Sequence, residues 1–173
     1  SDIDASLPNV AIKVMGPPPS SGTRDAFEEI VLEKLADEAG VALEIREDGA
    51  YIEAGENDNA IIAKLTGDAG LVGIAGFSFL DQNSDKVKGA DFGGVAPTFD
   101  NIAAGDYPVS RSLWFYVKND HLGVIKGIEE YVAEFTAENT WGPDGYLIDL
   151  GLINLPDAER VAPELGMPNG KFL

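Results

Sequence analysis

The chain has 173 residues, of which 45% are hydrophobic, enough for one ordinary domain or two small lobes with a packed core. Twelve Lys and Arg residues against 30 Asp and Glu residues give a formal net charge of −18. This balance excludes a nucleic-acid-binding surface and an anionic-membrane surface, because both need a basic face, and the absence of cysteine excludes disulfides and thiol chemistry.

The first third of the chain predicts the start of an α/β fold. Residues 10–15 read as a buried strand, and a loop with three prolines follows at 17–19. Apolar residues at helical spacing predict a helix over 23–39, which ends at Gly40. We expect a second strand over 41–46, because valine, leucine and isoleucine alternate there with other residues. Strand, loop, helix and strand in this order are the start of an α/β layout.

Shorter helices and strands are expected in the rest of the chain. No apolar run in the sequence approaches the length of a membrane span. Helices are predicted at 59–65, 77–82, 97–104, 122–135, 136–141 and 144–150, and strands at 71–76, 92–95 and 107–117. The stretch 107–117 is the longest strand candidate. From Asp157 onward the chain is a tail punctuated by proline and glycine.

Small polar residues gather where the first helix begins. Ser20, Ser21, Gly22 and Thr23 lie there, and the first turn of a helix has unpaired N–H groups and a partial positive charge. Hydroxyl groups beside such N–H groups make a site for a small oxyanion such as phosphate. The other interpretation is that Ser20 or Ser21 simply caps the helix. The net negative charge does not exclude a local anion site, since salt screens distant charges over about 10 Å.

The sequence gives little support for a nucleotide-binding, calcium-binding or catalytic site. The spacing from Gly16 to Gly22 does not fit a nucleotide-binding P-loop, and no lysine follows. Asp81, Asn83 and Asp85 lack the glycine and glutamate that an EF-hand needs. His121 is the single histidine and is interpreted as a surface or capping residue. We therefore expect no catalytic residues, no metal ion and no cofactor.

Three stretches together resemble the periplasmic phosphate-binding proteins of ABC transporters, in the type II clamshell family. They are Ser21-Gly22-Thr23 with Arg24-Asp25; Gly55-Glu56-Asn57-Asp58-Asn59 followed by Gly73–Phe79 and Gln82-Asn83; and Gly94–Thr98, Tyr107–Arg111, Phe135-Thr136 and Trp141–Tyr146. The ordering and spacing resemble that family over roughly residues 10–156.

The resemblance implies a fold, a ligand and a partner. The fold would be an α/β three-layer sandwich with a mixed, mostly parallel sheet, plus a C-terminal helical return segment. The protein would capture inorganic phosphate in the periplasm and deliver it to an ABC permease of the inner membrane. Ser21, Gly22 and Thr23 would hold the phosphate oxygens, with Ser20 as a neighbouring ligand.

The sequence departs from the family pattern at one ligand. Many members place an arginine four residues before the serine, where this chain has Pro17. Two interpretations of Arg24 stay open: it supplies the guanidinium instead, or it points away and pairs with Asp25 or Asp58. Asn57 and Asp58 are expected to orient the ligand residues, with helix capping as the other interpretation.

The chain is also short for the family. We interpret residues 1–107 as the second lobe, which carries the anion loop, and 108–173 as a segment that returns to the first lobe, so that a signal peptide and the N-terminal half would be absent. Trp114, Phe115, Tyr116 and Trp141 are interpreted as core residues, but without a first lobe an exposed apolar patch at Trp114 would favour a homodimer. The alternatives are a receptor for another oxyanion, such as sulfate, molybdate or a phosphonate, and an interaction or regulatory domain whose Ser-Gly-Thr loop is only a helix cap.

Overall fold

The computed structural model describes residues 4–6 and 9–156, and the tail expected from Asp157 lies outside them. The chain divides into two compact units, Ser1–Ala90 and Asp91–Leu173, which are described separately. This division falls earlier than the lobe boundary expected after residue 107, and that assignment of lobes stays a prediction. None of the helices in the described part is long and apolar enough to cross a membrane.

The first unit is built on a parallel sheet of three strands. The strands are β1 (Lys13–Gly16), β2 (Tyr51–Glu53) and β3 (Leu71–Gly73), in the order β2-β1-β3. Met15 in β1 lies opposite Ile52 on one side and Gly73 on the other. The predicted α/β class with a parallel sheet is therefore confirmed.

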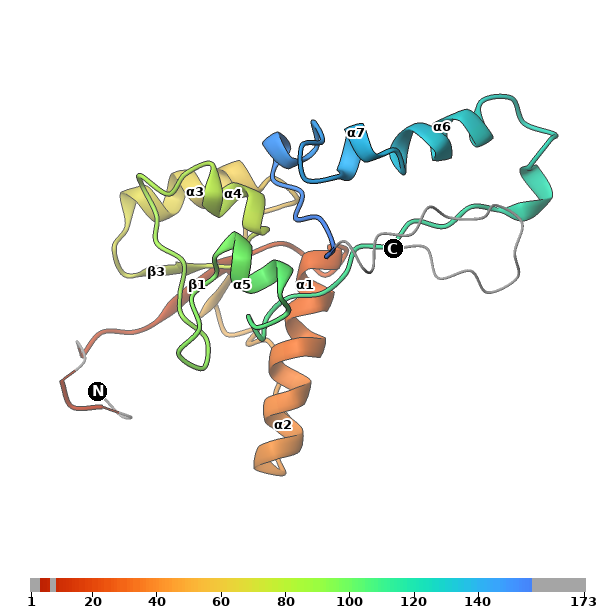
Figure 1. The fold of residues 1–173 in the computed structure, drawn as a ribbon. Helices are drawn as coiled ribbons and strands as arrows, with labels where there is room; N and C mark the ends of the chain where they lie inside the picture. The colour runs from red at the N-terminus through yellow and green to blue at the C-terminus, as the bar shows by residue number, and fades with distance from the viewer. Residues whose placement is uncertain (1–3, 7–8, 157–173) are drawn as a thin grey trace. The chain divides into compact units, whose positions relative to one another are not determined.

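One long helical segment connects β1 to β2 (Figure 1). It consists of α1 (Gly22–Phe27), a π-helical stretch (Glu28–Glu33) and α2 (Lys34–Ala39), and it ends at Gly40, whose φ of 66° is left-handed. Glycine adopts this conformation without the steric cost of a Cβ. The helix predicted over 23–39 is confirmed, within one residue at its start.

Helices α3 (Asp58–Gly67) and α4 (Phe77–Asp81) follow β2 and β3. The chain moves outward from β1 to β2 and then back across β1 to β3, so right-handed connections place the α1–α2 segment and α3 on opposite faces of the sheet. The core on the α3 side includes Met15, Ile61 and Ile62, all at most 8% exposed. This arrangement has the three layers that the family resemblance implies.

The strand predicted at 41–46 is wrong. Residues 41–46 are not in the sheet, and the strand that pairs with β1 is Tyr51–Glu53 instead. Val41 remains 54% exposed. The chain reaches β1 only after the turn at 47–50, where Gly49 has a φ of 87° and the Asp48 carboxylate accepts the Ala50 N–H. Alternating apolar residues did not indicate which stretch would meet the sheet.

The second unit contains short helices. They are α5 (Phe99–Ala103), α6 (Ile128–Phe135), α7 (Glu138–Trp141) and two 3₁₀ turns at Asn119–His121 and Ile148–Leu150. The Thr98 hydroxyl caps α5 by accepting the Asn101 N–H at 3.2 Å. Of the strand predicted at 92–95, only an isolated bridge between Phe92 and Val95 is present.

The longest predicted strand, 107–117, has irregular structure. A strand needs a neighbour for its N–H and C=O groups, and the described part of this unit forms no sheet. The helix predicted over 122–135 is limited to its second half, because Gly123 and Gly127 have φ values of 70° and 92°. The helix predicted at 144–150 is reduced to its 3₁₀ turn.

The aromatic residues of this unit are only partly buried. The ring of Phe115 packs edge-on against that of Phe135, with 4.9 Å between the ring centroids. The Trp141 Nε1–H donates to the Thr136 carbonyl at 2.7 Å. Trp114 is 47% exposed, and Tyr116 is 91% exposed. The expectation that Trp114 and Tyr116 are core residues is therefore wrong for this unit as described.

Candidate anion-binding site

The carboxyl edge of the parallel sheet brings three loops together. Residues 17–21 follow β1, 54–57 follow β2 and 74–76 follow β3, and each loop leads into a helix: α1, α3 and α4. Parallel strands present their carboxyl ends at one edge, which is where open α/β sheets bind ligands. The predicted anion loop lies at this edge, in the first of the three loops.

Ser21 is the N-cap of α1. Its hydroxyl oxygen accepts the Thr23 N–H at 3.3 Å, its own N–H donates to the Pro18 carbonyl at 3.0 Å, and the residue is 7% exposed. The capping interpretation is therefore confirmed for Ser21. Capping uses the hydroxyl as an acceptor, and a serine hydroxyl also has one proton to donate. The cap and an anion-binding role are chemically compatible at this residue.

Ser20 is exposed and makes a different contact. Its hydroxyl donates to Oε1 of Glu56 at 2.7 Å, which joins the loop after β1 to the loop after β2. This contact brings a carboxylate beside the predicted anion loop. An anion that took the Ser20 hydroxyl would have to displace Glu56.

Asn57 and Asp58 organise the other two loops. The Asn57 side chain caps α3 by accepting the Asn59 N–H at 3.0 Å. One oxygen of Asp58 accepts the Gly76 N–H at 3.1 Å, where Gly76 is the residue before α4. Asn57 thus has the capping role, whereas Asp58 ties the first turn of α3 to the loop after β3. Their effect on ligand orientation remains a prediction.

Arg24 has partners that the sequence interpretation missed. Its Nε donates to Glu28 Oε1 at 2.8 Å and one terminal nitrogen donates to Glu53 Oε1 at 3.3 Å, so neither Asp25 nor Asp58 is its ion-pair partner here. The guanidinium also lies over the Tyr51 ring, 5.1 Å from its centre. The hydrogen bond that Arg24 donates to Glu28 raises the pKa of Arg24 further, and the Arg24 side chain is only 13% exposed.

Tyr51 links Arg24 to the anion loop. Its hydroxyl donates to the Pro17 carbonyl at 2.6 Å, and Pro17 is fully buried. Burial raises the pKa of this phenol, while the charge of Arg24 opposes the change. Tyr51 and Glu53 share one face of β2, because strand residues alternate. Sequence reasoning missed both, although a Tyr-x-Glu pattern on a correctly placed strand would have indicated them.

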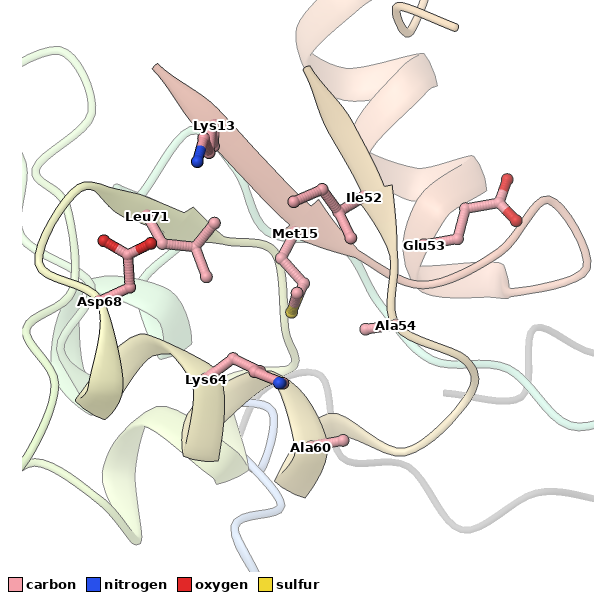
Figure 2. A pocket seen from close by; sticks show the side chains of 9 residues that line it. All are labelled: Lys13, Met15, Ile52, Glu53, Ala54, Ala60, Lys64, Asp68 and Leu71. Carbon is pink, nitrogen blue, oxygen red and sulfur yellow. The ribbon is translucent and has the colours of Figure 1, made fainter. Parts of the chain in front are cut away.

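A hollow of about 480 Å³ lies elsewhere in this unit, between the sheet and α3 (Figure 2). Met15 and Ile52 point toward it from the strands, and Ala60 and Lys64 line it from α3. None of the residues 20–24 lines this hollow. It is therefore distinct from the predicted anion loop.

The predicted absence of a metal ion concerns the side chains of the described ranges, 4–6 and 9–156. No group of three or more His, Cys, Asp or Glu side chains in these ranges could hold a metal ion. His121 ends a 3₁₀ turn, and its backbone N–H donates to the Lys118 carbonyl at 2.9 Å.

Comparison with known proteins places these loops in a family context. A family model described as a PBP superfamily domain matches residues 1–139. The chain is 32% identical over 136 residues to a phosphate-binding protein PstS of Staphylococcus epidermidis, an alignment that covers 76% of this chain and 38% of that protein. It is 29% identical over 121 residues to the protein SphX of Synechococcus elongatus, covering 66% of this chain and 33% of SphX.

A solved structure has the same fold. The crystal structure of a possible phosphate binding protein from Planctomyces limnophilus matches with a TM-score of 0.60 and 23% identity, over 92% of this chain and 54% of that chain. At this identity the likeness concerns the fold alone. The chain spans less than half the length of the curated relatives described above.

Proposed function

Because this chain belongs to the PBP superfamily, we propose that it binds inorganic phosphate as part of the solute-binding component of an ABC-type importer. The relatives named as phosphate-binding proteins support phosphate as the ligand. The observation that carries the proposal is the position of Ser21, buried at the N-cap of α1, at the carboxyl edge of the parallel sheet. The role is binding and delivery, without catalysis.

In the proposed site, hydroxyl and backbone groups of Ser20, Ser21, Gly22 and Thr23 hold the anion. The N-terminal end of the 22–39 helical segment adds a favourable partial charge. Arg24 was also expected to be a ligand, but Glu28 and Glu53 already compensate its charge. We therefore assign the main contacts to residues 20–23. Phosphate bound to this chain alone is expected to be held weakly, because few donors converge on it.

The proposal predicts a selective loss of anion binding. Phosphate and sulfate are titrated into the purified chain by calorimetry, in low and moderate salt. The wild type should bind phosphate, and a Ser21→Ala, Thr23→Val double variant should lose at least tenfold in affinity. Unchanged binding by the double variant would reject this loop as the site. Preference for sulfate, molybdate or a phosphonate would keep the loop and replace the ligand.

The proposed location and partner follow from the same family assignment. We infer an extracytoplasmic, periplasmic position and transfer of phosphate to an ABC permease of the inner membrane. A test is co-purification of the chain with a phosphate permease from membranes. Association with an unrelated protein, independent of phosphate, would favour the alternative of an interaction or regulatory domain.

We also propose that the chain forms a homodimer through the Trp114 segment. This proposal is supported by exposed apolar side chains, because Leu113, Trp114 and Tyr116 are 72%, 47% and 91% exposed. Burial of these side chains against a second copy would lower the free energy of the dimer. Light scattering at high concentration should detect a dimer that a Trp114→Ser, Tyr116→Ser variant lacks. A strict monomer would reject this part of the proposal.

A further inference from the structure

We propose that Arg24 is a positioning residue, which shapes the anion loop through Tyr51 and does not touch the anion. The predicted change in phosphate affinity rests on the proposed function. The effect of Arg24 and Tyr51 on the shape of the loop can be measured without any ligand.

The positive charge of Arg24 is already paired with two carboxylates. Its guanidinium donates to Glu28 on its own helix and to Glu53 at the end of β2, at 2.8 and 3.3 Å. One positive charge thus faces two carboxylates, so the cluster has no positive charge left over for an anion. The Arg24 side chain is 13% exposed, so turning it toward a ligand would bring it into water and would break both hydrogen bonds to the carboxylates.

The ring beneath Arg24 transmits its position to the loop. The guanidinium lies 5.1 Å from the centre of the Tyr51 ring, a distance typical of a cation–π contact. The hydroxyl of the same ring donates to the Pro17 carbonyl at 2.6 Å. Pro17 is the first residue of the loop that ends at Ser21. Arg24 therefore holds the ring, and the ring holds the beginning of the loop.

The backbone around Tyr51 fits this arrangement closely. Gly16 precedes Pro17, and a Cβ added to Gly16 would overlap the Tyr51 hydroxyl. The Gly16 carbonyl accepts the Ala54 N–H at 2.9 Å, which fixes the strand ends beside the ring. Glycine at this position leaves the space that the hydroxyl needs to reach Pro17. Tyr51 and Gly16 thus act on the same contact.

The loop beyond Pro17 depends on its first residue. The Ser21 N–H donates to the Pro18 carbonyl at 3.0 Å, so a change at Pro17 is passed directly to the turn that carries Ser21. Three consecutive prolines give this segment few alternative conformations. A displaced Pro17 therefore moves the serines as a unit.

The test uses Tyr51→Phe, Arg24→Gln and their double variant, with Tyr116→Phe as the matched control. Tyr51→Phe keeps the ring under Arg24 and removes only the hydroxyl. The first readout is amide hydrogen exchange of Ser21 without phosphate, after far-UV circular dichroism has verified folding. We expect exchange at least threefold faster in each variant, and no change in the control. Unchanged exchange in Tyr51→Phe would overturn the proposal.

The second readout is phosphate affinity. Positioning predicts a three- to tenfold loss in each single variant, and a double variant no weaker than the weaker single one, because both break the same link. Direct contact predicts a loss in Arg24→Gln alone, additive effects and a reduced salt dependence.

Gly16→Ala gives an independent check, because it displaces the tyrosine hydroxyl while keeping both side chains. It should reproduce the exchange and affinity changes of Tyr51→Phe, and wild-type behaviour would contradict the proposal. If the wild type fails to bind phosphate, the proposed function fails, and the exchange data still decide whether Arg24 and Tyr51 shape the loop.

Discussion

The hydroxyl of Ser20 donates a 2.7 Å hydrogen bond to Glu56, so a carboxylate already occupies one donor of the predicted anion loop. Both side chains are exposed. In the proposed function, a phosphate ion must compete with Glu56 for this donor, and it must also bind near a like charge. The contact joins the two loops, and we expect it to weaken anion binding.

Glu56→Gln should strengthen phosphate binding about threefold at low salt, the effect of removing one like charge about 6 Å away in water-like surroundings. The gain should shrink at high salt, because exposed charges are screened. Calorimetry at two salt concentrations measures it, with Glu44→Gln as the control at another exposed position. A weaker phosphate affinity, with sulfate unaffected, would instead mean that Glu56 accepts a proton from phosphate.

Capping and anion binding can be separated at Ser21 and Thr23. Ser21→Ala removes the cap of α1 and should lower the free energy of unfolding by about 1 kcal/mol. Thr23→Val keeps that cap and should cost less than about 0.5 kcal/mol. Both should weaken phosphate about tenfold, the typical effect of one hydrogen bond to a charged group. Urea unfolding and calorimetry give the two quantities.

The control for that pair is Thr66→Val, on the exposed side of α3. It should leave phosphate affinity at the wild-type value. If Thr23→Val also binds phosphate as the wild type does, the Thr23 hydroxyl is not a ligand, and the site is reduced to Ser20, Ser21 and the backbone.

Gly73 should tolerate no side chain. A Cβ there would lie 2.6 Å from a methyl carbon of Leu65 and 3.0 Å from one of Ile61, which is fully buried. Gly73→Ala should therefore lower the free energy of unfolding by about 1–3 kcal/mol through overpacking between β3 and α3. Gly67→Ala, with open space around it, should be neutral or slightly stabilising. Equal stability of the two variants would contradict the packing of α3 on the sheet.

The Tyr51 phenol should make stability depend on pH in the alkaline range. Burial raises its pKa above the ordinary value of about 10, so the folded state keeps the proton where the unfolded state loses it. The stabilising contribution is complete below pH about 10 and is lost as the pH rises through the folded pKa. The wild type should thus exceed Tyr51→Phe in stability at pH 8 and lose part of this advantage near pH about 11. A constant difference across this range would contradict the burial of Tyr51.

Several parts of the fold could be predicted because local chemistry determines them. The helical segment 22–39 has apolar residues at helical spacing and a glycine that ends it. Thr98 and Asn57 cap their helices as residues of their type usually do. Ser21 was placed at the start of α1 by the same reasoning.

Long-range pairing was not predictable in the same way. Residues 41–46 have a strand-like pattern, but the short segment Tyr51–Glu53 pairs with β1. Because that strand was misplaced, Tyr51 and Glu53 were missed, and with them the partners of Arg24. The stretch 107–117 likewise has strand-forming residues and lacks a partner strand within the described part of its unit. Sequence patterns indicate what a segment can form, whereas the neighbour decides what it forms.

The proposed phosphate site can be tested most directly by an NMR titration of the ¹⁵N-labelled chain with inorganic phosphate, using sulfate as the comparison. We expect saturable shifts of the backbone amides of Ser20 to Arg24, with smaller shifts around Asn57 and none in the hollow beside Lys64. These shifts should be much reduced in the Ser21→Ala, Thr23→Val variant. Absence of shifts at Ser20 to Arg24, or equal shifts in that variant, would contradict the claim that this loop binds the anion.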